Sequence, residues 1–165
     1  MPKTLFDFSE MVVRCVHTRD FTNALKKEEI KIIFANFLVT VHNYSNHNFT
    51  ELAATERHCH EVKDDYMKAR IGKLIGWKSK EIEDLKRKSI WQIPIGEEPR
   101  LFGIVKKVKY PHISHIFQVL LFDPNHKTYK KSGKNILAFL TNAVCLFSED
   151  DECWEAAQQK LKLKK

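Results

Sequence analysis

Apolar residues in the first half of the chain recur every three or four positions, the spacing of an amphipathic helix. The clearest case predicts a helix from about Lys26 to His42. Its apolar face consists of Ile30, Phe34, Phe37 and Val41. Asn48 begins a capping-box pattern and predicts a short second helix, and further helices are predicted over residues 64–75 and from Ser79. Residues before position 25 fit either a strand or a short helix.

The period changes at Ser89 to the pattern of strands separated by turns. Three strands are predicted, at residues 90–95, 100–108 and 113–122. The last is apolar on both faces toward its end, as in a central strand. Lys127–Lys131 is a candidate fourth strand, and helical spacing returns over residues 135–163. We therefore expect an α+β fold: a helical N-terminal half, a three- to four-stranded antiparallel meander, and C-terminal helices.

Length and composition favour one domain over residues 1–165. It comprises a mainly helical part (1–88), a basic β-meander (89–131) and C-terminal helices (135–163). The 43 % of hydrophobic residues can fill one core. Asp7 and Glu10 exclude a signal peptide, and no apolar stretch reaches the ~20 residues that span a bilayer. We expect a soluble, cytoplasmic protein with no membrane partner.

The four cysteines lie far apart and form no CxxC motif. We interpret them as small buried hydrophobic residues, and we expect no cofactor. A weak alternative is a metal site at His58 and His60, which would share one face of a strand. The chain has no P-loop, GxGxxG, GxSxG or HExxH motif, which argues against the large families that those motifs define.

The charge of the chain is concentrated in residues 100–134. This segment has eight Lys or Arg and one Asp, so its own charge of +7 equals the net charge of the whole chain. We expect these cations to form one surface for a polyanion, most simply nucleic acid, with His126 at its edge. The candidate nucleic-acid-binding residues are Lys106, Lys107, Lys109, Lys127, Lys130, Lys131 and Lys134.

Candidate chemistry lies where the most apolar strand ends in the turn Asp123-Pro124-Asn125-His126. Polar groups at the end of a rigid strand are well positioned for a site. His126 is a candidate general acid or base, and Tyr129 or Arg100 would position a phosphate. The alternatives are an ordinary turn with solvated lysines, and a structural ion pair of Arg100.

Two motifs carry a family resemblance: R-L-F-G at 100–103 and F-D-P-N-H-K-x-Y at 122–129. With these the chain resembles small, mostly uncharacterised bacterial and phage proteins and, more distantly, the RelE/HigB-type toxins. The toxin resemblance implies metal-independent cleavage of messenger RNA, and an antitoxin as a possible partner. A ribose 2′-hydroxyl would attack the adjacent phosphate, with His126 or Tyr129 as acid or base. Arg100, Lys127 and Lys130 would then stabilise the developing charge.

Three functions remain open at this stage. The first is a toxin-like endoribonuclease with Arg100, His126 and Tyr129 as catalytic residues. The second is a non-catalytic nucleic-acid-binding regulator that uses the same lysines, with Phe and Tyr as stacking platforms. The third is a phage or defence protein whose basic face binds an acidic protein. Growth arrest on expression would separate the first function from the other two.

Overall fold

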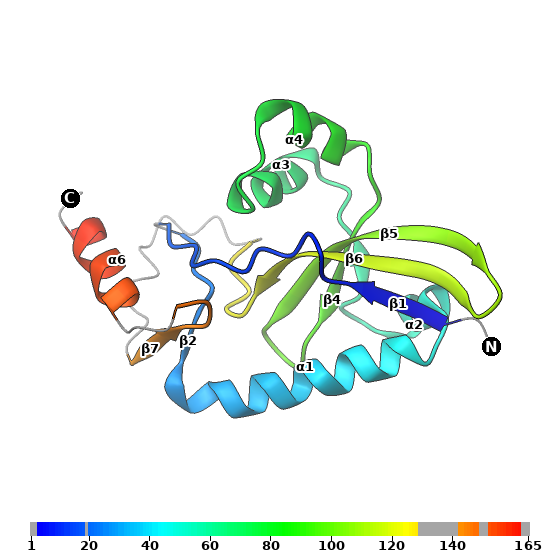
Figure 1. Cartoon of the computed structure of the whole chain (residues 1–165), viewed down its shortest axis with the longest axis horizontal. Coiled ribbons are helices and arrows are strands. Elements are labelled where there is room, and N and C mark those ends of the chain that lie inside the picture. The colour runs from blue at the N-terminus through cyan, green and yellow to red at the C-terminus, as the bar shows by residue number, and fades with distance from the viewer. Residues whose placement is uncertain (1–2, 19, 129–141, 149–151, 163–165) are drawn as a thin grey trace.

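A computed structural model describes residues 3–18, 20–128, 142–148 and 152–162. Its main sheet has five strands in the order β1-β6-β5-β4-β3 (Figure 1). The strands are β1 (Lys3–Asp7), β3 (His60–Glu61), β4 (Ile90–Pro94), β5 (Arg100–Tyr110) and β6 (Ile113–Asp123). β1 runs parallel to β6, and the other neighbours are antiparallel. A separate two-stranded sheet pairs β2 (Ala24–Lys26) with β7 (Ala143–Cys145).

Helices cover both faces of the main sheet. α1 (Ile30–Ser45) and α2 (Phe49–Thr55) lie on one face, and α3 (Asp65–Leu74) and α4 (Ser79–Lys86) lie on the other. A further helix is α6 (Glu152–Lys162). Alternate residues of β5 divide between two cores: Leu101 packs in the core on the α1 and α2 side, and Phe102 packs in the core with α3 and α4. β6 is apolar on both faces because both faces are covered. α6 lies at the far end of the molecule, beside β7 (Figure 1).

The α+β class and the main predicted elements are confirmed. The helices at α1 to α4 and the strands at β4 to β6 all occur, and β6 is a central strand between β1 and β5. Asn48 begins α2, its side chain accepting a hydrogen bond from the Thr50 N–H. Gly76 follows α3 at φ 84°, a backbone conformation that glycine adopts without strain. Among the described helices, none combines the length and apolar character that crossing a bilayer requires.

Three predictions about the sheet and the C-terminal part are wrong. The sheet is not a purely antiparallel meander, since β1 pairs parallel with β6, and both β1 and β3 come from the part predicted as mainly helical. Lys127 and Thr128 are not in a strand. Residues 143–145, predicted as helix, form β7, because their partner is β2, which lies more than a hundred residues earlier. The rest of the predicted helix before residue 142, and residues 129–131 of the predicted fourth strand, lie outside the described residues.

An ion pair ties the segment around Asp20 to α3. The Arg70 Nη1 donates to Asp20 Oδ2 at 2.6 Å. Burial alone would raise the pKa of Asp20, but the hydrogen bond and charge of Arg70 outweigh burial and lower that pKa. A lowered folded-state pKa stabilises the fold above the unfolded-state pKa, and this stabilisation is lost as the pH falls through the folded-state pKa.

We therefore expect acid to destabilise the wild type more than the Asp20→Asn variant, which has no carboxylate to protonate. Urea unfolding followed from about pH 6 to about pH 3 measures the difference. Equal losses of unfolding free energy in the two proteins would contradict the role given to this ion pair.

Candidate functional site

Arg100 is buried at the start of β5, with 2 % of its surface exposed. Its Nη1 donates to the backbone carbonyls of Glu97, Glu98 and Pro99 at 2.8–2.9 Å. Asp123 lies opposite Arg100 in the β5–β6 pairing and is fully buried. Burial lowers the pKa of Arg100, while the charges of Asp123 and Glu98 oppose that shift. Arg100 thus holds the β4–β5 turn together, and its catalytic role stays a prediction.

The Asp123 carboxylate organises the turn that follows β6. It accepts hydrogen bonds from the N–H groups of Asn125 (3.3 Å) and Thr128 (2.7 Å). The Asn125 side chain donates to the carbonyls of Thr22 and Ala24, which joins this turn to β2. His126 is partly buried and has φ 50°, in the left-handed region that lets the chain reverse within a few residues. The turn is therefore a packed connector, and the acid–base role of His126 stays a prediction.

The basic residues of the meander do not form one surface with His126. Arg100 and Asp123 are paired at one end of the β5–β6 hairpin, and Tyr110 and Ile113 are paired at the other. The intervening strand length places the two ends about 30 Å apart. Among the described residues, the basic segment is thus divided between the two ends, which corrects the prediction of one contiguous surface. Lys127 is partly buried, and its carbonyl accepts a hydrogen bond from Arg70.

The free end of the hairpin is exposed and basic. Lys106, Lys107 and Lys109 are exposed, and 62 % of the Tyr110 surface is exposed. They are exposed together because β4 pairs with β5 only as far as Ile104. The nearby acidic group is Asp7 on β1, whose pKa is lowered mainly by hydrogen bonds from Ser9 and, to a smaller extent, by the charge of Lys106.

β1 adds a further cation at this end. The Lys3 N–H donates to the His112 carbonyl at 2.8 Å, so the exposed residue Lys3 lies beside the hairpin turn. Figure 1 shows the start of β1 at this end of the sheet. Burial, together with the charge of Lys107, lowers the pKa of His115 on β6. That imidazole is therefore neutral at pH 7, and it packs against the Phe49 ring.

His58 and His60 are not joined by a third ligand among the described residues. His60 is in β3, where its Nε2 lies 3.3 Å from Gln92 Nε2, whereas His58 is in the preceding turn. The two residues do not alternate along one strand as the sequence suggested. A metal site at this pair gains no support from the structure, and we do not propose one.

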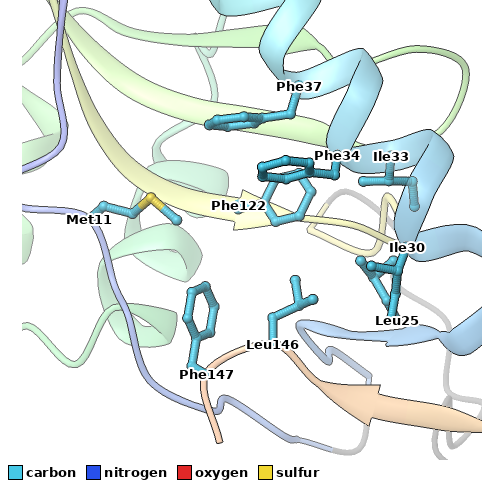
Figure 2. Close-up of a pocket in the computed structure, with 9 residues that line it drawn as sticks. All are labelled: Met11, Leu25, Ile30, Ile33, Phe34, Phe37, Phe122, Leu146 and Phe147. Carbon is cyan, nitrogen blue, oxygen red and sulfur yellow. The ribbon is translucent and has the colours of Figure 1, made fainter.

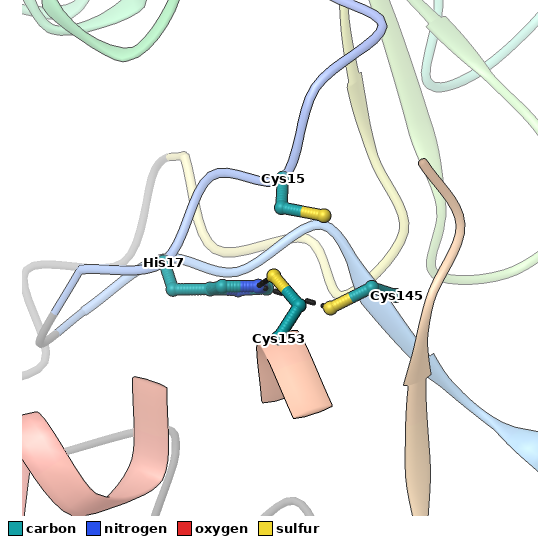
Figure 3. A group of neighbouring side chains, drawn as sticks. All are labelled: Cys15, His17, Cys145 and Cys153. Atoms are coloured by element: carbon teal, nitrogen blue, oxygen red, sulfur yellow. Dashed lines mark hydrogen bonds between the residues drawn. The ribbon is translucent and has the colours of Figure 1, made fainter. Parts of the chain in front are cut away.

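A different group of side chains meets beside β2 and β7 (Figure 3). Cys15 and His17 precede β2, Cys145 ends β7, and Cys153 is in the first turn of α6. The cysteines were predicted to be separate buried hydrophobic residues, and His17 was not among the candidate ligands. The local signals were the pairs Cys15-x-His17 and Cys145-x7-Cys153, but neither is specific by itself. Only Cys59 lies apart from this group, in the core beside α1 and α2.

The apolar pocket of the molecule lies between α1 and the segment after β7 (Figure 2). It has a volume of about 260 Å³. All of its lining residues are apolar: Met11, Leu25, Ile30, Ile33, Phe34, Phe37, Phe122, Leu146 and Phe147. Among the described residues, the lining of the pocket therefore offers no group for acid–base chemistry or phosphate binding.

The remaining predicted site residues, Tyr129, Lys130, Lys131 and Lys134, lie outside the described residues. A family model with the description "Uncharacterised protein UU032" matches residues 7–150. This agrees with the resemblance to a small family and gives no link to the RelE/HigB-type toxins. No curated protein and no solved structure matches the chain.

Proposed function

We propose that this chain, which belongs to the UU032 family, binds single-stranded nucleic acid through the free end of the β5–β6 hairpin. The observation that carries the proposal is the grouping of three exposed lysines and the exposed Tyr110 within residues 106–110. Lysines attract the phosphates of a strand, and an exposed aromatic ring stacks on a base whatever the sequence. Lys3 extends the basic surface from β1.

The geometry favours binding of nucleic acid without its cleavage. Arg100 is buried and donates to backbone carbonyls, so it offers no exposed fork to a phosphate. His126 lies at the opposite end of the hairpin from the exposed lysines. The proposal therefore includes no ribonuclease step, and intact RNA is the expected result of any incubation.

Edge protection is a second explanation for the same lysines. Residues 106–110 extend beyond β4 and form an exposed strand edge, and lysines at such an edge keep it from pairing with other chains. That explanation needs no exposed aromatic ring and predicts no binding of nucleic acid. The experiment below distinguishes the two explanations.

The test removes three charges from the hairpin and compares the result with the removal of three charges elsewhere. We expect the Lys106→Gln/Lys107→Gln/Lys109→Gln variant to bind short fluorescent single-stranded RNA or DNA roughly 10- to 100-fold more weakly at ~150 mM salt. The slope of log affinity against log salt should fall by about two, since each phosphate contact on a single strand contributes about 0.7. Tyr110→Ala should cost about 1–3 kcal/mol through lost stacking.

The control removes the exposed lysines 73, 78 and 80, which lie near the end of α3 and at the start of α4, away from the hairpin end (Figure 1). Its affinity and salt slope should stay close to those of the wild type. Equal losses in the two triple variants would show an unspecific effect of net charge and contradict the proposed surface. The absence of binding by the wild type would favour edge protection, and degradation of the RNA would favour the endoribonuclease.

A further inference from the structure

Three segments of the chain that are distant in sequence bring sulfur and nitrogen ligands to one point. The ligand atoms of Cys15, His17, Cys145 and Cys153 all lie within 4.8 Å of one another (Figure 3). His17 Nε2 is 3.1 Å from Cys145 Sγ and 3.8 Å from Cys153 Sγ. Zinc with bonds of about 2.3 Å to sulfur and 2.0 Å to nitrogen places tetrahedral ligands about 3.5–3.8 Å apart. The group is thus close to the size of a zinc site.

We propose that these four side chains bind one zinc ion as a closed, structural Cys3His site. Three thiolates and one imidazole complete a tetrahedron, and they leave no position for water or substrate. Soft sulfur ligands favour zinc over magnesium or calcium, which prefer oxygen. The inference is independent of the proposed nucleic-acid binding, because the site lies beside β2 and β7 and the basic surface is the far end of the hairpin.

The imidazole is oriented by a second layer of contacts. His17 Nδ1 lies 2.8 Å from the hydroxyl of Thr22, which is fully buried. When Nδ1–H donates to this hydroxyl, the Nε2 lone pair points at the thiols. Metal-bound histidines usually have such a partner on their other ring nitrogen, which fixes the tautomer and the ring orientation.

The backbone that carries Cys15 is held by a single buried side chain. Asn23 is 2 % exposed; it accepts a hydrogen bond from the Val16 N–H and donates to the Arg14 carbonyl. It therefore fixes the chain on both sides of Cys15. Cys145 is positioned by its pairing with Ala24 across β2 and β7. The positions of Cys15 and Cys145 are thus set before a metal binds, as a preorganised site requires.

The surroundings also need a metal for stability. The apolar cluster here consists of small side chains: Ala24, Ala143 and Cys145, with Cys15, Cys153 and Ala157 packed against them. β2 and β7 pair over only three residues each, and a two-stranded sheet of this size is marginal by itself. A structural zinc supplies folding free energy that a small core cannot provide. Here it would join β7 and the start of α6 to the segment before β2.

Hydrogen bonds alone account poorly for the group. Thiols are weak donors and weak acceptors, so three of them around an imidazole gain little from each other. A bound cation would instead stabilise the thiolates of the three cysteines.

The experiment measures metal in the full chain, expressed and purified without chelators. Mass spectrometry of the digested protein should find about one zinc per chain. Cys145→Ser and Cys153→Ser should each reduce the zinc content to a small fraction. Cys59→Ser is the matched control, since Cys59 is buried in a separate core, and it should keep the zinc.

A second measurement on the wild type covers the case in which a variant fails to fold. When the thiols are titrated with a mercurial reagent, zinc release should be complete once three cysteines have reacted. The protein with cobalt in place of zinc should show a thiolate-to-cobalt charge-transfer absorption band. The proposal is overturned if the purified chain contains no zinc, if two of these cysteines form a disulfide, or if zinc is retained in both serine variants.

Discussion

Replacing Arg100 with alanine should lower the free energy of unfolding by about 3–5 kcal/mol. The change removes the donor of three backbone carbonyls in the β4–β5 turn. It also leaves the buried Asp123 carboxylate facing no cation on β5, and an uncompensated buried charge is among the costliest defects of a fold. Urea unfolding measures the loss.

Arg57→Ala is the matched control, because Arg57 is exposed. Its unfolding free energy should stay within about 0.5 kcal/mol of the wild type. The double variant Arg100→Met/Asp123→Asn should recover part of the loss, since it removes both buried charges while an amide oxygen remains to accept from the turn. A double-mutant cycle then gives the coupling between the two side chains.

The same prediction determines how a toxicity assay should be interpreted. If Arg100→Ala abolishes growth arrest or RNA cleavage but also lowers stability by several kcal/mol, the loss reports unfolding and not catalysis. An Arg100→Ala protein that is as stable as the wild type would contradict the structural role. In that case the catalytic role that the sequence suggested would become the better explanation.

Local patterns predicted the elements whose partners are close in sequence. β5 and β6 form a hairpin around the turn at Pro111, and their alternation and turn residues are visible in one short stretch. β1 was not assigned to the sheet, because its parallel partner β6 begins more than a hundred residues later and no turn fixes the pairing. β7 was taken for helix for the same reason.

The candidate site shows the same limit. The exposed lysines of the hairpin were predicted, since an unpaired strand end with consecutive charges is a local feature. For Arg100 the sequence allowed two roles, phosphate binding or a structural ion pair. Burial distinguishes these roles, and the burial of Arg100 depends on β4, β6 and the turn together. The Cys and His residues around His17 could not be grouped, because 128 positions separate His17 from Cys145 and only the β2–β7 pairing brings them together.

The second large effect is expected at Gly103 on β5, where there is no room for a side chain beside β6. A Cβ at this position would lie 2.5 Å from the Gln118 carbonyl oxygen and 2.5 Å from Cε1 of Phe117. The carbonyl belongs to the neighbouring strand, and the Phe117 ring is fully buried, so neither can move aside without shifting the sheet. Gly103→Val should therefore lower the unfolding free energy by about 3 kcal/mol.

Gly72→Ala provides the comparison, since its new Cβ would meet a side-chain carbon of Ile82 at 2.7 Å and not backbone. There α3 gains about 1 kcal/mol of helix propensity, which offsets part of the crowding, so the net loss should be smaller than at Gly103. Thermal or urea unfolding of the two variants ranks them directly. If Gly103→Val is as stable as Gly72→Ala, then β5 and β6 are further apart at this point than the pairing of Gly103 with Val119 implies.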